Sequence, residues 1–181
     1  ANNHAMDYSH NGLLATMRYL HQYGIRFAGI GENLADASAP VYMDCENGRV
    51  ALIAATSSFH EAWRAGNQRG DMQGRPGVNP LRFQTKLHVT AEELAALRKI
   101  AEETQIDAQQ LLDIKEGFAV ETPGAFRFGG HEFVESEAPG KETITHPADL
   151  KRITASIQEA KSQADCVMVS IHSHELGGLR K

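Results

Sequence analysis

An unbroken apolar run at residues 50–55 limits the fold more than any other feature of this sequence. Its residues are Val-Ala-Leu-Ile-Ala-Ala, without a polar side chain to face water. A strand with one solvated face alternates apolar and polar residues, whereas a strand covered on both faces is apolar throughout. The run therefore predicts a strand of an α/β protein that is covered on both of its faces.

A helix followed by a strand is predicted near the end of the sequence. Residues 147–164 form an amphipathic pattern, with Pro147 in the first turn of the expected helix. Residues 165–171 follow as a buried strand, in which Cys166 is expected to be a buried free thiol. The apolar stripe of the helix is expected to consist of Leu150, Ile153, Ile157 and Ala160.

Another helix is predicted at residues 7–23, where apolar residues recur with a period near 3.6. Asp7 or Ser9 is expected to cap its start and Gly24 to end it, before a short strand at residues 25–29. Helices that alternate with strands in this order are typical of βαβ sheet proteins.

Turn and capping signals mark the remaining elements. Asn47-Gly48 predicts the turn of a hairpin between residues 41–44 and 49–56. Residues 57–83 are rich in Gly, Pro and Arg and are expected to form a long loop. A single domain is predicted over residues 1–181, with an insertion at 84–146 that contains helices at 90–103 and 107–114 and a strand pair within 126–135.

The composition excludes two classes of function for these residues. A net charge of -5 gives no electrostatic reason to expect nucleic-acid binding. No apolar run approaches the roughly 20 residues of a membrane-spanning helix. The nine histidines are numerous for a chain of 181 residues and raise the question of a metal site instead.

The first candidate site is Asn2-Asn3-His4, shortly before the helix predicted at residues 7–23. The amide oxygen of Asn is a hard, neutral metal ligand, and a neighbouring His can protonate a leaving group. The N-terminus of the helix would add a preference for a bound anion. The alternative is that Asn3 and His4 only cap the helix, since Asn is a favoured capping residue.

The second candidate site is His172-Ser173-His174, directly after the strand predicted at residues 165–171. Ligands of open α/β sheets bind beyond the carboxyl ends of the strands. His172 and His174 are two residues apart and share one face of an extended backbone. Imidazole is the commonest metal-binding side chain, so these residues are candidate ligands. The alternative is a pair of loop histidines that bind nothing.

Several segments form a set that matches a known family. They are Asn2-Asn3-His4-x-x-Asp7-Tyr8, Ala28-Gly29-x-Gly31-x-Asn33-Leu34, Arg75-Pro76-Gly77-Val78-Asn79-Pro80-Leu81 and the strand that ends in His172. This set resembles the CapA family of bacterial proteins linked to poly-γ-glutamate and capsule synthesis, which is similar to the calcineurin-like metallophosphoesterases. The resemblance implies an α/β fold, part of a metallophosphoesterase-like αββα sandwich with mixed sheets. The family commonly has Gly at the position of Ser9 and His-Trp-Gly at the position of His172-Ser173-His174.

The resemblance also implies roles for individual residues. Asn3 and His172 would be metal ligands, and His4 would be the catalytic proton donor. We expect these three residues to converge at one end of the sheet, because each lies where a strand should end or a helix begin. His174 and Asp7 are candidates for further ligands or for residues that support a ligand, although Asp7 is expected rather to cap the helix or brace His4. The implied cofactors are divalent metal ions, two in the intact protein, with manganese, iron or zinc as the candidates.

Other parts of the family pattern do not occur in these 181 residues. They are a Gly-Asp strand end, an Asn-x-Glu motif and a Gly-His-x-x-His motif. Two metal ions need several oxygen and nitrogen ligands, which Asn3 and His172 alone do not supply. We therefore expect the sequence to be an internal part of a longer protein, incomplete at both ends and inactive by itself.

Three residues in the segment that follows the apolar run are candidates for substrate binding. His60 follows the strand, and Arg64 and Arg75 lie in the long loop, where a guanidinium group can hold a phosphate or carboxylate. The alternatives are a structural histidine and a solvated basic loop, since surface arginines are common.

The leading hypothesis is a metal-dependent, phosphoesterase-like hydrolase in capsule or poly-γ-glutamate and envelope polymer metabolism. One alternative is a non-catalytic component of capsule synthesis or export that binds an anionic polymer. Another is an amide hydrolase that acts on γ-glutamyl chains. The implied partners are a small-molecule or anionic polymer substrate and an envelope polymer-synthesis complex. The implied location is the bacterial cell envelope.

Overall fold

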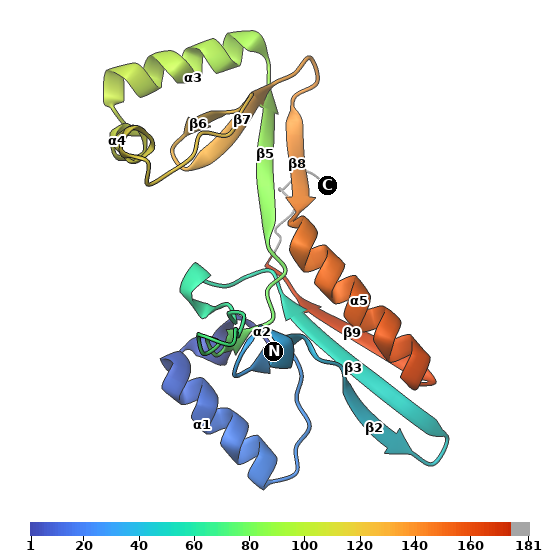
Figure 1. Ribbon diagram of the computed structural model, residues 1–181. Coiled ribbons are helices and arrows are strands. Elements are labelled where there is room, and N and C mark those ends of the chain that lie inside the picture. The colour runs from blue at the N-terminus through green and yellow to red at the C-terminus, as the bar shows by residue number, and fades with distance from the viewer. Residues whose placement is uncertain (175–181) are drawn as a thin grey trace. The chain divides into compact units, whose positions relative to one another are not determined.

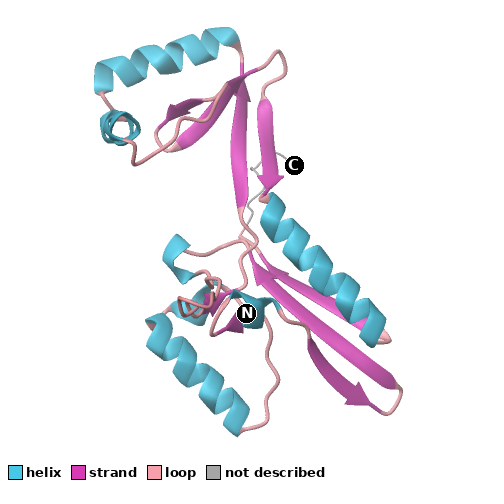
Figure 2. Ribbon diagram, viewed as in Figure 1, coloured by secondary structure: helices cyan, strands magenta, loops and turns pink. Residues whose placement is uncertain are grey.

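The computed structural model describes residues 1–174 (Figure 1). The chain divides into two compact units. The first unit contains residues 1–82 and continues from residue 145, and the second unit contains residues 83–144. Helices and strands are mixed in each, which confirms the predicted α/β class (Figure 2). That residues 84–146 are an insertion into a family domain stays a prediction.

A three-stranded sheet organises the first unit. Its strands are β2 (Val41–Cys45), β3 (Gly48–Thr56) and β9 (Cys166–His172), in the order β2-β3-β9. β3 is antiparallel to β2 and parallel to β9. Ala51, Ile53, Ala54 and Ala55 of β3 are buried, which confirms that the apolar run is a covered strand.

The helix α5 (Pro147–Gln163) precedes β9 and packs on this sheet. Its Ala160 joins Ala51 and Ile53 in one buried cluster. The predicted helix is confirmed, but the predicted apolar stripe is partly wrong, because Leu150 is 53% exposed. The side chain of Asp149 is buried instead and forms ion pairs with two arginines.

The strand β9 is predicted correctly in position but wrongly in burial. Most of its side chains are exposed, and Cys166 is a free, exposed thiol rather than a buried one. In the part of the chain that the structure describes, β9 lies at the edge of its sheet. An edge strand has a neighbour on one side only, so its apolar residues receive less cover than those of β3.

The N-terminal elements form a second buried cluster of the first unit. They are η1 (Asn3–Met6), α1 (Ser9–Gln22), β1 (Ile30–Gly31), α2 (Leu34–Ser38), η2 (Glu61–Trp63) and β4 (Gly77–Val78), which pairs with β1. Met6, Leu13, Met17, Ile30 and Val78 form the cluster. This packing holds η1 and the start of α1 in one place.

Local details of this region differ from the sequence-based predictions. Tyr8 occupies the N-cap of α1 and makes no side-chain capping bond. The prediction that Asp7 or Ser9 caps the start of this helix was therefore wrong. No strand forms at residues 25–29; the strand that pairs with β4 begins at Ile30, after Gly29, whose φ of +85° lies outside the extended region. The β2–β3 hairpin is confirmed, but Cys45 pairs with Gly48, so Glu46 and Asn47 form its turn.

The second unit is a four-stranded sheet with two helices. Its elements are β5 (Phe83–Val89), α3 (Ala91–Thr104), α4 (Ala108–Glu116), β6 (Phe126–Phe128), β7 (His131–Glu135) and β8 (Gly140–Thr145), with strand order β6-β7-β5-β8. Thr90 and Glu93 form the predicted capping box, and Gly129-Gly130 turns the predicted strand pair. The strands β5 and β8 were not predicted, and β8 is polar and shows no apolar alternation.

Ser9 has a backbone conformation that suits glycine. Its φ is +61°, in the left-handed region, which costs a residue with a Cβ atom about 1–2 kcal/mol. Replacing Ser9 by Gly removes this cost but adds roughly 0.5–1 kcal/mol of backbone entropy in the unfolded chain. We expect Ser9→Gly to raise the free energy of unfolding by about 0.5–1 kcal/mol in urea titrations.

Ser162 provides the matched control for this substitution. It lies in α5 with ordinary helical backbone. Ser162→Gly is expected to lower stability by about 0.5 kcal/mol, because glycine disfavours helical backbone in this last turn of α5 and the hydrogen bond from the Ser162 hydroxyl to the Glu159 carbonyl is lost. A loss of stability in Ser9→Gly would show that the left-handed conformation is not strained.

Candidate functional site

Asn3 and His172 meet although 169 residues separate them in the chain. The Nε2 atom of His172 lies 2.7 Å from the Oδ1 atom of Asn3. An amide oxygen only accepts hydrogen bonds, so Nε2 carries the proton in this contact. The predicted convergence of the two side chains is confirmed, and their role as metal ligands stays a prediction.

The two atoms lie at a hydrogen-bond distance, which is shorter than the spacing of metal ligands. Ligand atoms about 2.1 Å from an ion lie about 3 Å apart at right angles and about 3.4 Å apart in a tetrahedral site. The observed separation of 2.7 Å would therefore have to widen for joint coordination. Asn3 and His172 fit a metal ion as two of its ligands, once the contact has widened and Nε2 has lost its proton.

The ends of two parallel strands hold His172 in place. Its carbonyl oxygen accepts hydrogen bonds from the backbone N–H of Ser57, at 2.9 Å, and from the Oγ1 of Thr56, at 3.3 Å. Both residues stand at the end of β3, beside the last pair of the β3–β9 register. The candidate site thus lies at the carboxyl end of the sheet, where ligands of α/β proteins bind.

His174 adds a second imidazole beside His172. The two rings pack edge to face, with 4.7 Å between their centroids. The backbone N–H of His174 donates to the Oγ of Ser58 at 2.8 Å, which ties this residue to the segment after β3. His174 is therefore placed close to the Asn3–His172 pair, as the spacing of two residues predicted.

His4 is oriented by Asp7. The Nδ1 atom of His4 lies 3.0 Å from the Oδ2 atom of Asp7, and both side chains are exposed. A carboxylate that accepts from Nδ1–H leaves Nε2 as the atom that can exchange a proton with a bound molecule. Asp7 accordingly braces His4, as expected, rather than capping α1.

The other candidate residues make contacts that shape the long loop. The Nδ1 of His60 accepts a hydrogen bond from the N–H of Ala62 at 3.2 Å, which caps η2. Arg64 pairs with Glu61, with 3.3 Å between Nε and Oε2. The Nε of Arg75 donates to the carbonyl oxygen of Arg64 at 3.0 Å. Their predicted contacts with substrate stay predictions.

A buried polar network was not predicted from the sequence. The Nε of Arg82 lies 2.7 Å from one carboxylate oxygen of Asp149, and the NH1 of Arg152 lies 2.7 Å from the other. Arg152 also donates from NH2 to the Oδ1 of Asn79, at 3.1 Å, and the Nδ2 of Asn79 donates to the carbonyl oxygen of Ala54, at 2.9 Å. The network joins the segment after β4 to α5 and β3.

The network explains part of the sequence that was assigned to a solvated basic loop. The side chain of Arg82 is largely covered, so the interpretation of residues 57–83 as a solvated basic loop was wrong for this arginine. Burial alone would raise the pKa of Asp149, but the hydrogen bonds from Arg82 and Arg152 outweigh it and hold that pKa well below its usual range. Asp149 thus forms ion pairs with Arg82 and Arg152, and these pairs stabilise the fold.

Residues 1–174 do not contain a complete metal site. No group of three or more His, Cys, Asp or Glu side chains in this range is placed to hold a metal ion. Asn3, His172 and His174 therefore need ligands from elsewhere to hold two ions. No helix in the same range is long and apolar enough to cross a membrane.

Comparison with known proteins identifies relatives of this chain. Residues 1–178 match the family model described as bacterial capsule synthesis protein PGA_cap. Two proteins of Sinorhizobium fredii (strain NBRC 101917 / NGR234), the uncharacterized proteins y4sH and y4uA, are each 30% identical over 184 residues. The alignments cover 98% of this chain and 36% of each relative. The chain thus spans about a third of the length of these relatives.

Proposed function

This chain belongs to the family of bacterial capsule synthesis proteins, and from that premise we propose that the whole protein is a metal-dependent hydrolase of phosphoester or related bonds. It would act in capsule or other envelope polymer metabolism. The observation that carries the proposal is the 2.7 Å contact between Asn3 and His172, next to His4 in the sequence. Poly-γ-glutamate is the polymer that the CapA resemblance suggests.

Asn3 and His172 would hold a divalent ion through Oδ1 and Nε2, with His174 as a candidate for an adjacent position. Ions of this kind supply a nucleophile at neutral pH and stabilise the negative charge that develops during hydrolysis. Manganese, iron and zinc are the candidates, and two ions would be held in the intact protein.

His4 would protonate the leaving group. Its Nδ1 lies 3.0 Å from the Oδ2 of Asp7, which keeps the ring oriented. Its Nε2 can then donate a proton to the departing oxygen, a contribution worth about 10²–10⁴-fold in rate. His4 directly follows Asn3, the proposed ligand, in η1.

The proposal is tested on the full-length protein, purified and loaded with manganese, iron or zinc. We expect turnover of aryl phosphoesters that disappears with a chelator and returns when the metal is restored. Elemental analysis should find two ions per chain after dialysis. Absence of turnover on every ester tested, despite a full metal complement, would count against hydrolysis.

A non-catalytic role in capsule synthesis is the second candidate. It is compatible with the same family membership, since a capsule synthesis protein can act by binding an anionic polymer. A component that only binds an anionic polymer need not hold two ions. Metal content of the full-length protein therefore separates the two proposals.

A further inference from the structure

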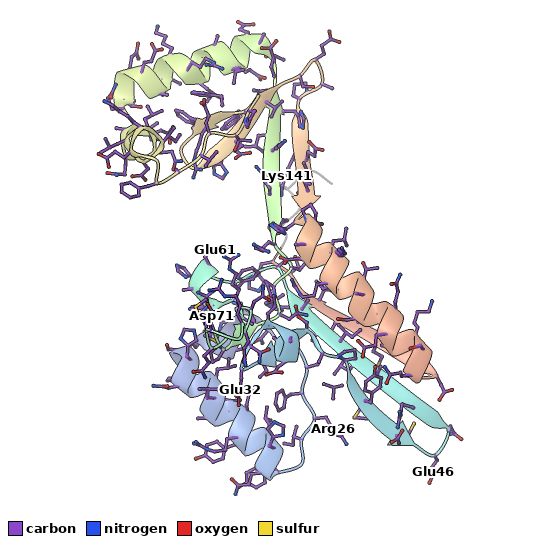
Figure 3. All side chains as sticks on the ribbon, viewed as in Figure 1. Arg26, Glu32, Glu46, Glu61, Asp71 and Lys141 are labelled. Atoms are coloured by element: carbon purple, nitrogen blue, oxygen red, sulfur yellow. The ribbon has the colours of Figure 1, made fainter. Side chains whose placement is uncertain are left out.

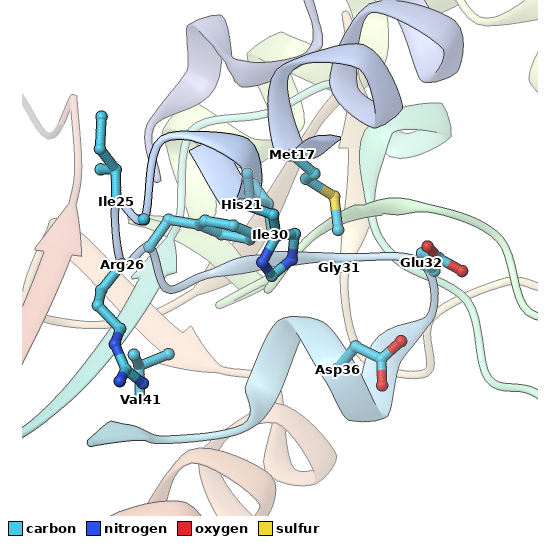
Figure 4. A pocket seen from close by; sticks show the side chains of 11 residues that line it. Met17, His21, Ile25, Arg26, Ile30, Gly31, Glu32, Asp36 and Val41 are labelled. Carbon is cyan, nitrogen blue, oxygen red and sulfur yellow. The ribbon is translucent and has the colours of Figure 1, made fainter. Parts of the chain in front are cut away.

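We propose that the first unit contains a second binding site, which takes a short peptide with free amino and carboxyl termini. The site is a cavity of about 550 Å³ between the last turns of α1, residues 24–27, β1, α2 and the start of β2 (Figure 4). This volume lies within the range of about 300–1,000 Å³ that is usual for ligand pockets. Neither the family match nor the candidate hydrolase site accounts for it.

The cavity is distinct from the Asn3–His172 pair. Its lining includes Met17, His21 and Gly24, at the C-terminal part of α1, whereas Asn3 and His4 precede the helix. Neither Asn3 nor His172 is among the residues that line the cavity.

Two side chains of opposite charge line the cavity without a direct partner. Within residues 1–174, neither Arg26 nor Glu32 forms a side-chain hydrogen bond or an ion pair, and Arg26 acts on Asp44 only as a more distant charge. The neighbouring Asp36 accepts a hydrogen bond from the Nδ2 of Asn33, at 2.7 Å. Asn33 is neutral, so Asp36 keeps its negative charge and adds a second carboxylate beside Glu32.

The two charges face the cavity from different sides. Figure 4 shows Arg26 on one side and Glu32, with Asp36, on the other. A guanidinium group recognises a carboxylate, and a carboxylate recognises an ammonium group, through charge-assisted hydrogen bonds. The arrangement suits a ligand that carries a carboxylate at one end and an ammonium group at the other.

The lining between the charged ends contains the His21 imidazole as well as apolar side chains (Figure 4). Met17, Ile30 and Val41 line the cavity, and Phe27 packs against the edge of the His21 ring with 5.0 Å between the ring centroids. In a free α-amino acid one carbon atom carries both charged groups, so they cannot reach opposite sides of a cavity. An extended peptide separates its termini by about 3.3–3.6 Å per residue and offers apolar side chains between them.

The test is isothermal titration calorimetry of the full-length protein with the tripeptide Leu-Ala-Leu, which measures the dissociation constant. We expect saturable binding of this peptide. N-acetylation or C-terminal amidation should each weaken binding about tenfold or more, because each removes one charge-assisted contact. Free leucine should bind far more weakly than the tripeptide.

Two variants assign each terminus to its side chain. Arg26→Gln should weaken binding about tenfold and should make amidation of the peptide inconsequential. Glu32→Gln should weaken binding and should reduce the effect of N-acetylation, although Asp36 still offers a carboxylate on that side. Both side chains are exposed and make no side-chain hydrogen bond, so neither change should disturb folding, which circular dichroism would verify.

Matched controls carry the same substitutions outside the cavity. Arg18→Gln changes an exposed arginine of α1, and Glu46→Gln changes the turn of the β2–β3 hairpin (Figure 3). Both controls should bind as tightly as the unaltered protein. The inference is overturned if Leu-Ala-Leu shows no binding at millimolar concentration, if free leucine binds equally well, or if the control variants weaken binding as much as Arg26→Gln and Glu32→Gln.

Discussion

Replacing Asp149 by alanine is expected to lower the free energy of unfolding by about 3–5 kcal/mol. The carboxylate is fully buried and receives hydrogen bonds from Arg82 and Arg152. Its removal leaves two largely covered guanidinium groups without their counter-charge, and the loss of one partner from a buried ion pair is strongly destabilising. Denaturant titration of the purified protein measures this loss.

An exposed ion pair gives the matched control. Asp44 contacts Arg49, with 2.6 Å between Oδ1 and Nε, but stands in water at the hairpin. Asp44→Ala removes the same side chain and is expected to change stability little, because solvent screens exposed pairs. Similar losses in Asp44→Ala and Asp149→Ala would show that burial does not determine the effect.

Acid should remove the same stabilisation from the unaltered protein. The pKa of Asp149 is lower in the folded state than in the unfolded chain, where it is about 3.9. The unfolded chain therefore binds the proton more readily, and stability falls as the pH drops below about 5. In Asp149→Asn this contribution is missing, so the difference in stability between the two proteins should shrink towards acidic pH.

Substitution of His172 and His4 in the full-length protein should have different effects if their proposed roles are right. His172→Ala removes a proposed ligand, so metal content measured after dialysis should fall and turnover should be lost with it. His4→Ala should retain the metal, while kcat falls about 10²–10⁴-fold through loss of the proton donor. Metal analysis combined with phosphoester kinetics separates the two roles.

His131 offers a control histidine for this comparison. It is exposed in the second unit, at the start of β7, and has no assigned role. His131→Ala should keep both metal and kcat. If His4→Ala loses as much metal as His172→Ala, then His4 is a ligand rather than the proton donor. If His172→Ala keeps its full metal content, then His172 is not a ligand.

Local sequence signals predicted most elements because the interactions that produce them are local. The Thr90–Glu93 capping box forms within one turn of α3. The helical period of residues 147–163 and the apolar run at 50–55 likewise need no information from distant parts of the chain. The same signals placed Asn3 just before a helix and His172 at the end of a strand, which was enough to predict that they converge.

Tertiary structure decided which of these side chains are buried and which groups pair. Periodicity suggested Leu150 for the buried face of α5, but Asp149 occupies it because Arg82 and Arg152 converge there from other segments. Strand pattern suggested a buried β9, but its edge position leaves much of it exposed. The residues that pair with a charged side chain, and those that bury an apolar one, lie far away in the chain, so no local pattern specifies them. The amino-acid sequence by itself predicted most of the helices and strands, though not β5 or β8, and the convergence of Asn3 and His172. The packing of distant segments determined the 2.7 Å contact between these two side chains and the burial of Asp149.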